Sequence, residues 1–151
     1  MKSVGNSVTL PRDLKSPDEV KAVFHALSEK VAWRLRLEGL MGTSVQISVR
    51  DTDLCTTERQ CSCEPTDNAL ELADCAVKLY TENYDVTAAV RSVGVRMTKL
   101  VSASCPQQAD MFDNSYCRRM KRAEIDRTVD KIREKYGTDA VRRAVSCTAV
   151  F

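Results

Sequence analysis

The tightest pair of carboxylates in the sequence is Asp51-Thr52-Asp53. Carboxylate oxygens are the ligands that Mg²⁺ prefers, so two of them this close form a candidate metal site. The pair also falls at a predicted hairpin end, where Asp is a common turn residue. No recognisable catalytic motif brings a further acid or a nucleophile to it. We therefore predict a turn here, and no catalytic residue, metal ligand or cofactor in the chain.

A second group of reactive side chains is Cys61-Ser62-Cys63, part of a set of seven cysteines. Metal ribbons use C-x-x-C knuckles, usually in pairs, whereas this sequence offers one C-x-C in a strand-like stretch. The N-terminus carries no apolar signal core, so we expect a cytoplasmic protein, in which a disulfide framework is disfavoured. The cysteines are therefore interpreted as thiols packed on and under a sheet.

The elements that position such residues are predicted to form one domain of ordinary size, because the chain has 151 residues. Hydrophobic residues make up 43% and aromatic residues 5%, which predicts an aliphatic core. No apolar run reaches the ~18 residues that a membrane span needs, so no membrane partner is expected. Residues 1–100 carry 13 basic and 14 acidic groups and residues 101–151 carry 10 and 7, so the net charge of +2 neither favours nor excludes a nucleic acid.

Hydrophobic periodicity predicts the order β-α-β-β-α-β in the first two thirds of the chain. Apolar and polar residues alternate in four predicted strands, at 3–10, 45–50, 56–63 and 91–100. This order is typical of an α+β fold, a split βαβ sandwich of the ferredoxin-like type or its reversed variant. We expect a four-stranded antiparallel sheet with two helices on one face.

The first helix is predicted to begin with a Ser16/Glu19 capping box, and Gly39 is a natural stop. Thr66 is the predicted cap of the second helix. The predicted core is aliphatic apart from one Phe and consists of Val4, Val8, Phe24, Leu27, Val31, Ile47, Val49, Leu70, Val77, Val93 and Val95.

The last third of the sequence differs from the rest in composition and periodicity. Residues 101–120 are rich in Ser, Gln, Asp and Asn and lack a period, which predicts a flexible linker after a 1–100 domain. Residues 121–151 are predicted as a helical tail. Its main helix covers 122–136, with a narrow apolar stripe, and ends at Gly137.

The outward face of the predicted sheet carries small, hydroxyl, amide and cationic groups with almost no acid. Such a face can approach a phosphate backbone closely, because hydroxyls, amides and guanidinium groups donate hydrogen bonds to phosphate. It offers no aromatic rings to stack single-stranded bases. The face is predicted to follow a duplex backbone; an ordinary solvated sheet face is the alternative that these residues leave open. The residues are Lys2, Ser3, Gly5, Ser7, Gln46, Ser48, Arg50, Ser92, Gly94 and Arg96.

Four spaced motifs match one known family in order. The chain resembles the little-finger domain of Y-family (DinB/UmuC-type) translesion DNA polymerases over residues 2–100, and Ala123–Arg143 resembles the basic helix that bacterial members often add. The resemblance implies a domain that lies across the major groove and holds the template-primer backbone. The motifs are Lys2–Ser7, Pro11–Leu14, Arg59–Gln60 and Arg91–Leu100.

The resemblance also carries residue roles and one departure. Glu58 stands where the family has hydroxyl or apolar groups, and a carboxylate beside DNA is unfavourable. The family's palm, with its metal-binding carboxylates, and its fingers and thumb have no counterpart in this sequence, so we expect a non-catalytic module that serves lesion bypass and DNA repair. The residues implied to bind DNA are Lys2, Ser3, Gly5, Asn6, Arg59, Gln60, Gly94 and Arg96.

The linker contains a segment that resembles the bacterial sliding-clamp pentapeptide, in which Gln and two variable positions precede a long aliphatic residue and Phe. Met111 and Phe112 offer adjacent apolar anchors for a hydrophobic cleft, and Gln108 can donate and accept hydrogen bonds at its edge. The alternative is that both anchors fold back on the module as a latch. The segment is Gln108-Ala109-Asp110-Met111-Phe112.

The expected partners are therefore duplex template-primer DNA and the bacterial sliding clamp, together with the polymerase catalytic core. A stand-alone ferredoxin-like interaction module without a DNA role is the alternative function. An enzyme that uses Cys61 and Cys63, or Asp51 and Asp53, is the third hypothesis.

Overall fold

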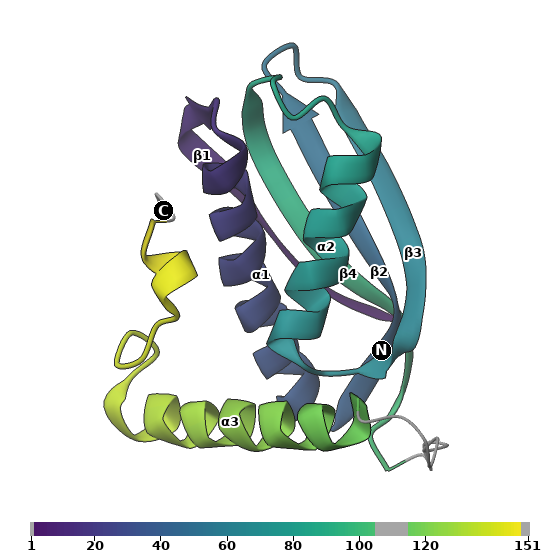
Figure 1. Cartoon of the computed structure of the whole chain (residues 1–151), viewed down its shortest axis with the longest axis vertical. Coiled ribbons are helices and arrows are strands. Elements are labelled where there is room, and N and C mark those ends of the chain that lie inside the picture. The colour runs from purple at the N-terminus through teal and green to yellow at the C-terminus, as the bar shows by residue number, and fades with distance from the viewer. Residues whose placement is uncertain (1, 105–114, 149–151) are drawn as a thin grey trace.

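The computed structural model describes residues 2–104 and 115–148, and the predicted clamp peptide 108–112 lies outside them. The order of elements in the first hundred residues is the predicted β-α-β-β-α-β. A third α-helix and a 3₁₀ helix follow (Figure 1). The elements are β1 (Ser3–Leu14), α1 (Pro17–Leu37), β2 (Leu40–Asp51), β3 (Thr56–Thr66), α2 (Ala69–Asn83), β4 (Val90–Ser102), α3 (Ser115–Tyr136) and η1 (Ala144–Thr148).

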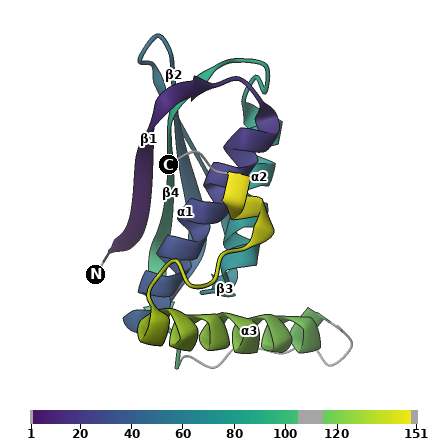
Figure 2. The same cartoon turned by 90° about the vertical axis from the view of Figure 1, so that its left-hand side faces the viewer.

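The four strands form one antiparallel sheet in the order β1-β4-β2-β3. Strands β1 and β2 are parallel to each other with β4 between them, and β3 and β4 flank β2 in the same way, which makes two interleaved split βαβ units. Both crossover helices lie on one side of the sheet, and Figure 2 shows the other side free of described helices. The predicted α+β fold is confirmed.

The core lies between the sheet and helices α1 and α2. Most predicted core residues are buried there, and Val8 and Val77 pack partly buried against it. Leu70 is the exception, because α2 turns Leu72 and Leu79 inward instead. The sequence allows two phases for this helix, since apolar residues stand on both sides of the predicted stripe.

The sequence predicted the N-cap residue of α1 but not its bonding, and it predicted the wrong cap for α2. Ser16 occupies the N-cap of α1 without a side-chain cap bond, and Glu19 instead pairs with Arg12 of β1 at 2.5 Å. At α2 the cap is Asn68, whose side-chain oxygen accepts from two backbone N–H groups, while Thr66 ends the longer strand β3.

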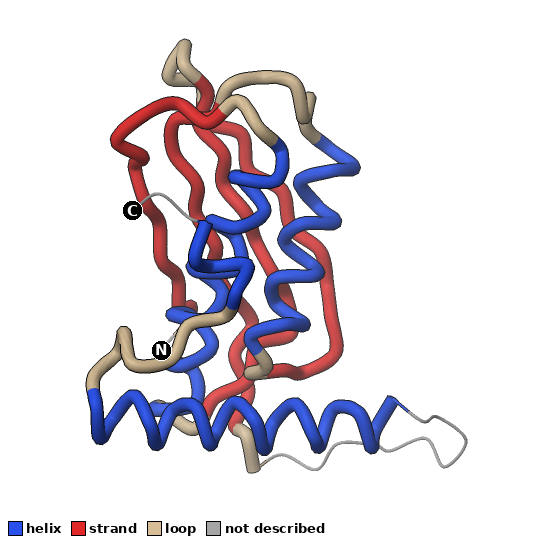
Figure 3. Tube along the Cα trace, turned by 60° about the vertical axis from the view of Figure 1, so that its left-hand side comes forward, coloured by secondary structure: helices blue, strands red, loops and turns tan. Residues whose placement is uncertain are grey.

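Helix α3 lies across one end of the helical layer, below the end of α1 and the start of α2 (Figures 1 and 3). It begins at Ser115, so residues 115–120 of the predicted linker are helical. The predicted apolar stripe, Ile125, Val129, Ile132 and Tyr136, faces the body only in part: Ile125 and Tyr136 are 55% and 66% exposed, whereas Val129 and Ile132 are half-buried. Val129 lines a cavity with Arg36 and Ala69 of the body, so the docking face includes one side of the stripe.

Charged side chains form much of that docking face. Asp126, only 4% exposed, accepts from Asn68 Nδ2 at 3.0 Å, from the Ala69 N–H at 3.2 Å and from Arg143 Nη2 at 2.8 Å. Arg36 of α1 binds both oxygens of Asp130, at 2.5 and 2.9 Å. Burial opposes the charge of Arg36, but the hydrogen bond and attraction of Asp130 hold its pKa above the ordinary value.

The tail after α3 continues this polar network. Arg133 donates to Glu29 of α1 at 2.7 Å and to the Val141 carbonyl, and Arg143 pairs with Glu29 at 3.2 Å. Ser146 of η1 donates to the same Glu29 carboxylate at 3.4 Å. The described residues after α3, up to residue 148, thus pack on the helical side, and no described helix covers the other sheet face, which is called the open face below.

Candidate nucleic-acid interface

The open face of the sheet is built from four cross-strand rows. Residues at alternate positions share one face of a strand, and the positions between these rows carry the buried valines of the core. Each row has one residue from each strand in the order β1, β4, β2 and β3. The rows are Ser3–Thr98–Ser44–Ser62, Gly5–Arg96–Gln46–Gln60, Ser7–Gly94–Ser48–Glu58 and Thr9–Ser92–Arg50–Thr56.

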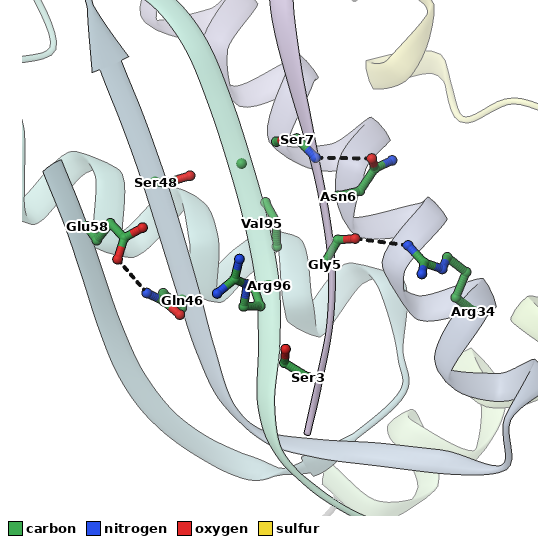
Figure 4. Close-up of a pocket in the computed structure, with 11 residues that line it drawn as sticks. Ser3, Gly5, Asn6, Ser7, Arg34, Gln46, Ser48, Glu58, Val95 and Arg96 are labelled. Carbon is green, nitrogen blue, oxygen red and sulfur yellow. Dashed lines mark hydrogen bonds between the residues drawn. The ribbon is translucent and has the colours of Figure 1, made fainter. Parts of the chain in front are cut away.

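The structure brings five of the eight predicted DNA-binding residues together on this face. Gly5, Arg96 and Gln60 share one row, with Ser3 and Gly94 in the rows on either side. Figure 4 shows several of these side chains around a hollow of about 450 Å³ over β1, β4 and β2.

The other three predicted residues lie elsewhere. Asn6 and Arg59 belong to the row that lies between the Gly5 row and the Ser7 row, and the side chains of that row start from the buried side of the sheet. Each of the two residues stands on an edge strand. Arg59 is exposed and donates to the Glu58 carbonyl, and the Asn6 side chain accepts from the Ser7 N–H at 3.0 Å. Lys2 precedes β1 and is exposed.

Two glycines form the floor of the open face. A Cβ at Gly94 would stand 2.4 Å from Ser48 Oγ and 3.2 Å from Ser7 Cβ, and one at Gly5 would stand 3.1 Å from Arg96 Cβ. Without these Cβ atoms the backbone of β4 and β1 is open to close approach between flanking hydroxyls. A phosphate group suits such a floor, because hydroxyls and a guanidinium surround it.

One carboxylate stands among these groups. Glu58 lies on the open face, in the row of Gly94, and its Oε2 accepts from Gln46 Nε2 at 2.9 Å (Figure 4). The Glu58 side chain is therefore directed outward, toward the face predicted to approach DNA. Glu58 reduces the positive charge of this face on the β3 side.

Asp51 takes the predicted turn position, whereas the cysteines follow the prediction only in part: Cys61, Cys63 and Cys75 pack against the core, but Cys55, Cys117 and Cys147 are exposed. Asp51 forms the β2–β3 turn and accepts from the Cys55 N–H at 2.9 Å. Burial raises the pKa of Cys63 to about 11, and burial also raises that of Cys75, so both thiols stay protonated at neutral pH. Within residues 2–104 and 115–148, no cluster of His, Cys, Asp or Glu has a metal-binding arrangement, and no helix is long and apolar enough to cross a membrane.

Sequence comparisons place the chain among bacterial polymerase relatives. It is 38% identical to DNA polymerase IV of Acetivibrio thermocellus over 146 residues, and 36% identical to that of Moorella thermoacetica over 149. These alignments cover 96% and 98% of this chain but 36% of each relative. The chain therefore spans about a third of the length of these curated relatives.

The fold and the family agree with the motifs. A solved complex of the beta-clamp processivity factor and the little finger domain of PolIV matches with a TM-score of 0.56 at 22% identity, over 74% of this chain and 99% of that one. At this identity the match establishes the fold. The model of the impB/mucB/samB family C-terminal domain matches residues 1–111. The chain belongs to this family and is a little-finger domain of the Y-family DNA polymerases, as its motifs predicted.

Proposed function

We propose that this chain is a non-catalytic module that holds duplex DNA for a translesion polymerase and tethers that polymerase to the sliding clamp. The observation that carries the DNA role is the open sheet face, where Arg96, hydroxyls and two glycines form a surface of phosphate-binding groups. Its contacts are with the backbone, so binding is independent of base sequence. The work of the module is lesion bypass and DNA repair in the cytoplasm of a bacterium.

The proposed DNA-binding set is Ser3, Gly5, Gln60, Gly94 and Arg96 on the open face, with Lys2, Asn6 and Arg59 reaching it from the sheet edges and the N-terminus. Few phosphates are contacted, so the dissociation constant should be about 10⁻⁴–10⁻⁶ M at physiological salt. That affinity is too weak to hold a polymerase at a primer end alone.

A second contact, to the sliding clamp, would compensate for this weak DNA affinity. We propose that Gln108–Phe112 binds the cleft of a bacterial sliding clamp, with Met111 and Phe112 as the apolar anchors. The clamp in the structurally similar complex supports this partner. Because a clamp encircles the same duplex, each contact raises the effective concentration of the other.

The DNA role is tested with Arg96→Gln, measured by fluorescence anisotropy on two short duplexes of different sequence over a range of salt. Loss of one phosphate contact should weaken binding equally on both duplexes and reduce the slope of log K against log salt by about 0.9. An unchanged slope, or a change in sequence preference, would contradict backbone binding and favour an interaction module without a DNA role.

The clamp role is tested with the double variant Met111→Ala and Phe112→Ala in calorimetry against a bacterial clamp. Binding should be lost while the melting temperature and DNA affinity stay unchanged, because the anchors belong to the peptide and not to the sheet. Clamp binding that persists in the double variant would refute the assignment. The matched control is Gln107→Ala, which lies outside the pentapeptide.

A further inference from the structure

Arg34 is the residue on which the open face and the helical layer meet. It belongs to α1, which packs on the opposite side of the sheet, yet its side chain lines the same hollow as Arg96 and Ser7. Figure 4 shows Arg34 beside the outer edge of β1, with its guanidinium turned toward that strand. Its Nη1 donates to the Gly5 carbonyl at 2.9 Å.

Gly5 links this residue to Arg96. Strand β1 is an edge strand, and the Gly5 carbonyl points to its free edge, where Arg34 binds it. On the open face the Arg96 stem covers the same residue, since a Cβ on Gly5 would stand 3.1 Å from Arg96 Cβ and 3.2 Å from its Cγ. The two cationic side chains therefore approach Gly5 from different sides.

The Arg34 guanidinium keeps donors for a further ligand. A guanidinium carries five N–H donors, and Arg34 gives one to the Gly5 carbonyl. Among the described residues it forms no ion pair with a carboxylate, and it is exposed. Arg36, two positions later, differs in each respect: it is mostly buried and binds Asp130 with two hydrogen bonds.

We propose that Arg34 is a second phosphate-binding residue, which takes a phosphodiester of the duplex backbone at the free edge of β1 while Arg96 takes another on the open face. This inference rests on the proposed DNA role and extends it to a residue of the helical layer. The Gly5 carbonyl orients the guanidinium, so part of its rotational freedom is already lost before DNA binds. A duplex held in this way overlaps the β1 side of the sheet, away from Glu58 on β3.

The test compares four variants in the same salt titration: Arg34→Gln, Arg34→Lys, Arg96→Gln and Lys78→Gln. Gln at position 34 keeps an N–H donor for the Gly5 carbonyl but removes the charge, and Lys keeps the charge. Lys78 is the matched control, because it is 74% exposed on α2 and pairs with Glu82 on its own helix. Thermal melting by circular dichroism checks that each variant is folded.

Arg34→Gln should flatten the salt slope by about 0.9, so that the affinity lost between 50 and 200 mM salt becomes about 3.5-fold smaller than in the wild type. Arg34→Lys and Lys78→Gln should keep the wild-type slope. A flattened slope with Arg96→Gln but not with Arg34→Gln would overturn this inference and leave the DNA role intact. Equal effects of Arg34→Gln and Lys78→Gln on the slope would show an effect of net charge alone and would overturn the inference about Arg34. An unchanged slope with Arg96→Gln would overturn the DNA role itself.

Discussion

Replacing Asp126 by Ala should release α3 from the body without unfolding the sheet. One carboxylate here joins α3 to the start of α2, through Asn68 and Ala69, and to the tail, through Arg143, and it is 4% exposed. Its removal leaves the Ala69 N–H without its buried acceptor and leaves Arg143 with Glu29 alone. Breaking such a buried ionic contact costs about 3–5 kcal/mol when the surroundings stay in place.

Charged contacts contribute much of the docking of α3. Two of its apolar residues, Ile125 and Tyr136, are more than half exposed. Undocking allows the unpaired groups to regain water. The first helical turn of α2 keeps its Asn68 cap, whose side chain accepts from the N–H groups of Leu70 and Glu71 at 3.1 Å.

Hydrogen exchange read by mass spectrometry separates the two outcomes. A loss of about 3 kcal/mol corresponds to roughly 100-fold faster exchange in peptides from α3, while peptides from β4 should keep their protection. Glu124→Ala is the matched control, because it removes the same charge from an exposed position of α3. If β4 lost protection together with α3, or if neither changed, the argument that α3 is a separately docked unit would be wrong.

Three further predictions concern the core, the open face and a buried thiol. Leu27→Ala, at a core position that is 1% exposed, should lower the free energy of unfolding by about 2–5 kcal/mol in urea titrations, and a loss near zero would mean that the α1 face is misassigned. Glu58→Gln should strengthen duplex binding in anisotropy, because a carboxylate leaves the open face, whereas Glu82→Gln on α2 should not; equal gains would point to net charge alone. Since the pKa of Cys63 is raised to about 11, its alkylation by iodoacetamide should be slow at pH 8 and rise about tenfold per pH unit below that pKa, while the exposed Cys117 reacts first; the reverse order in peptide mapping would contradict the burial of Cys63.

Most of the fold and the composition of the open face could be predicted from the alternation of apolar and polar residues in the strands. Val93, Val95 and Met97 alternate with Ser92, Gly94 and Arg96, and no other period fits that stretch. The parity of each strand then determines which side chains share a face. Thus Gly5, Gln46 and Arg96 were predictable as one surface before their row was visible in the pairing register.

The docking of α3 was not predictable by the same reasoning. Periodicity detects apolar stripes, but two of the four residues of the α3 stripe, Ile125 and Tyr136, are more than half exposed. The residues that hold the helix are ionic, and their partners Glu29 and Arg36 stand about a hundred positions earlier in the chain. No local sequence pattern encodes a pairing at that separation. Arg34 was missed for a related reason, since the Gly5 carbonyl that it reaches stands 29 positions earlier in the chain.

The position of α3 bears on whether one module can hold DNA and a clamp together. Ala103 after β4 donates to the Gly39 carbonyl and lines a groove with Asp130 of α3, so the chain leaves the sheet at the end of the molecule where α3 docks. Helix α3 and the tail lie on the helical side (Figure 2). Residues 105–114, which contain the proposed clamp peptide, therefore join two described segments that lie away from the open face. If a clamp binds there as proposed, it need not cover Arg96, and the two proposed attachments can then reinforce each other.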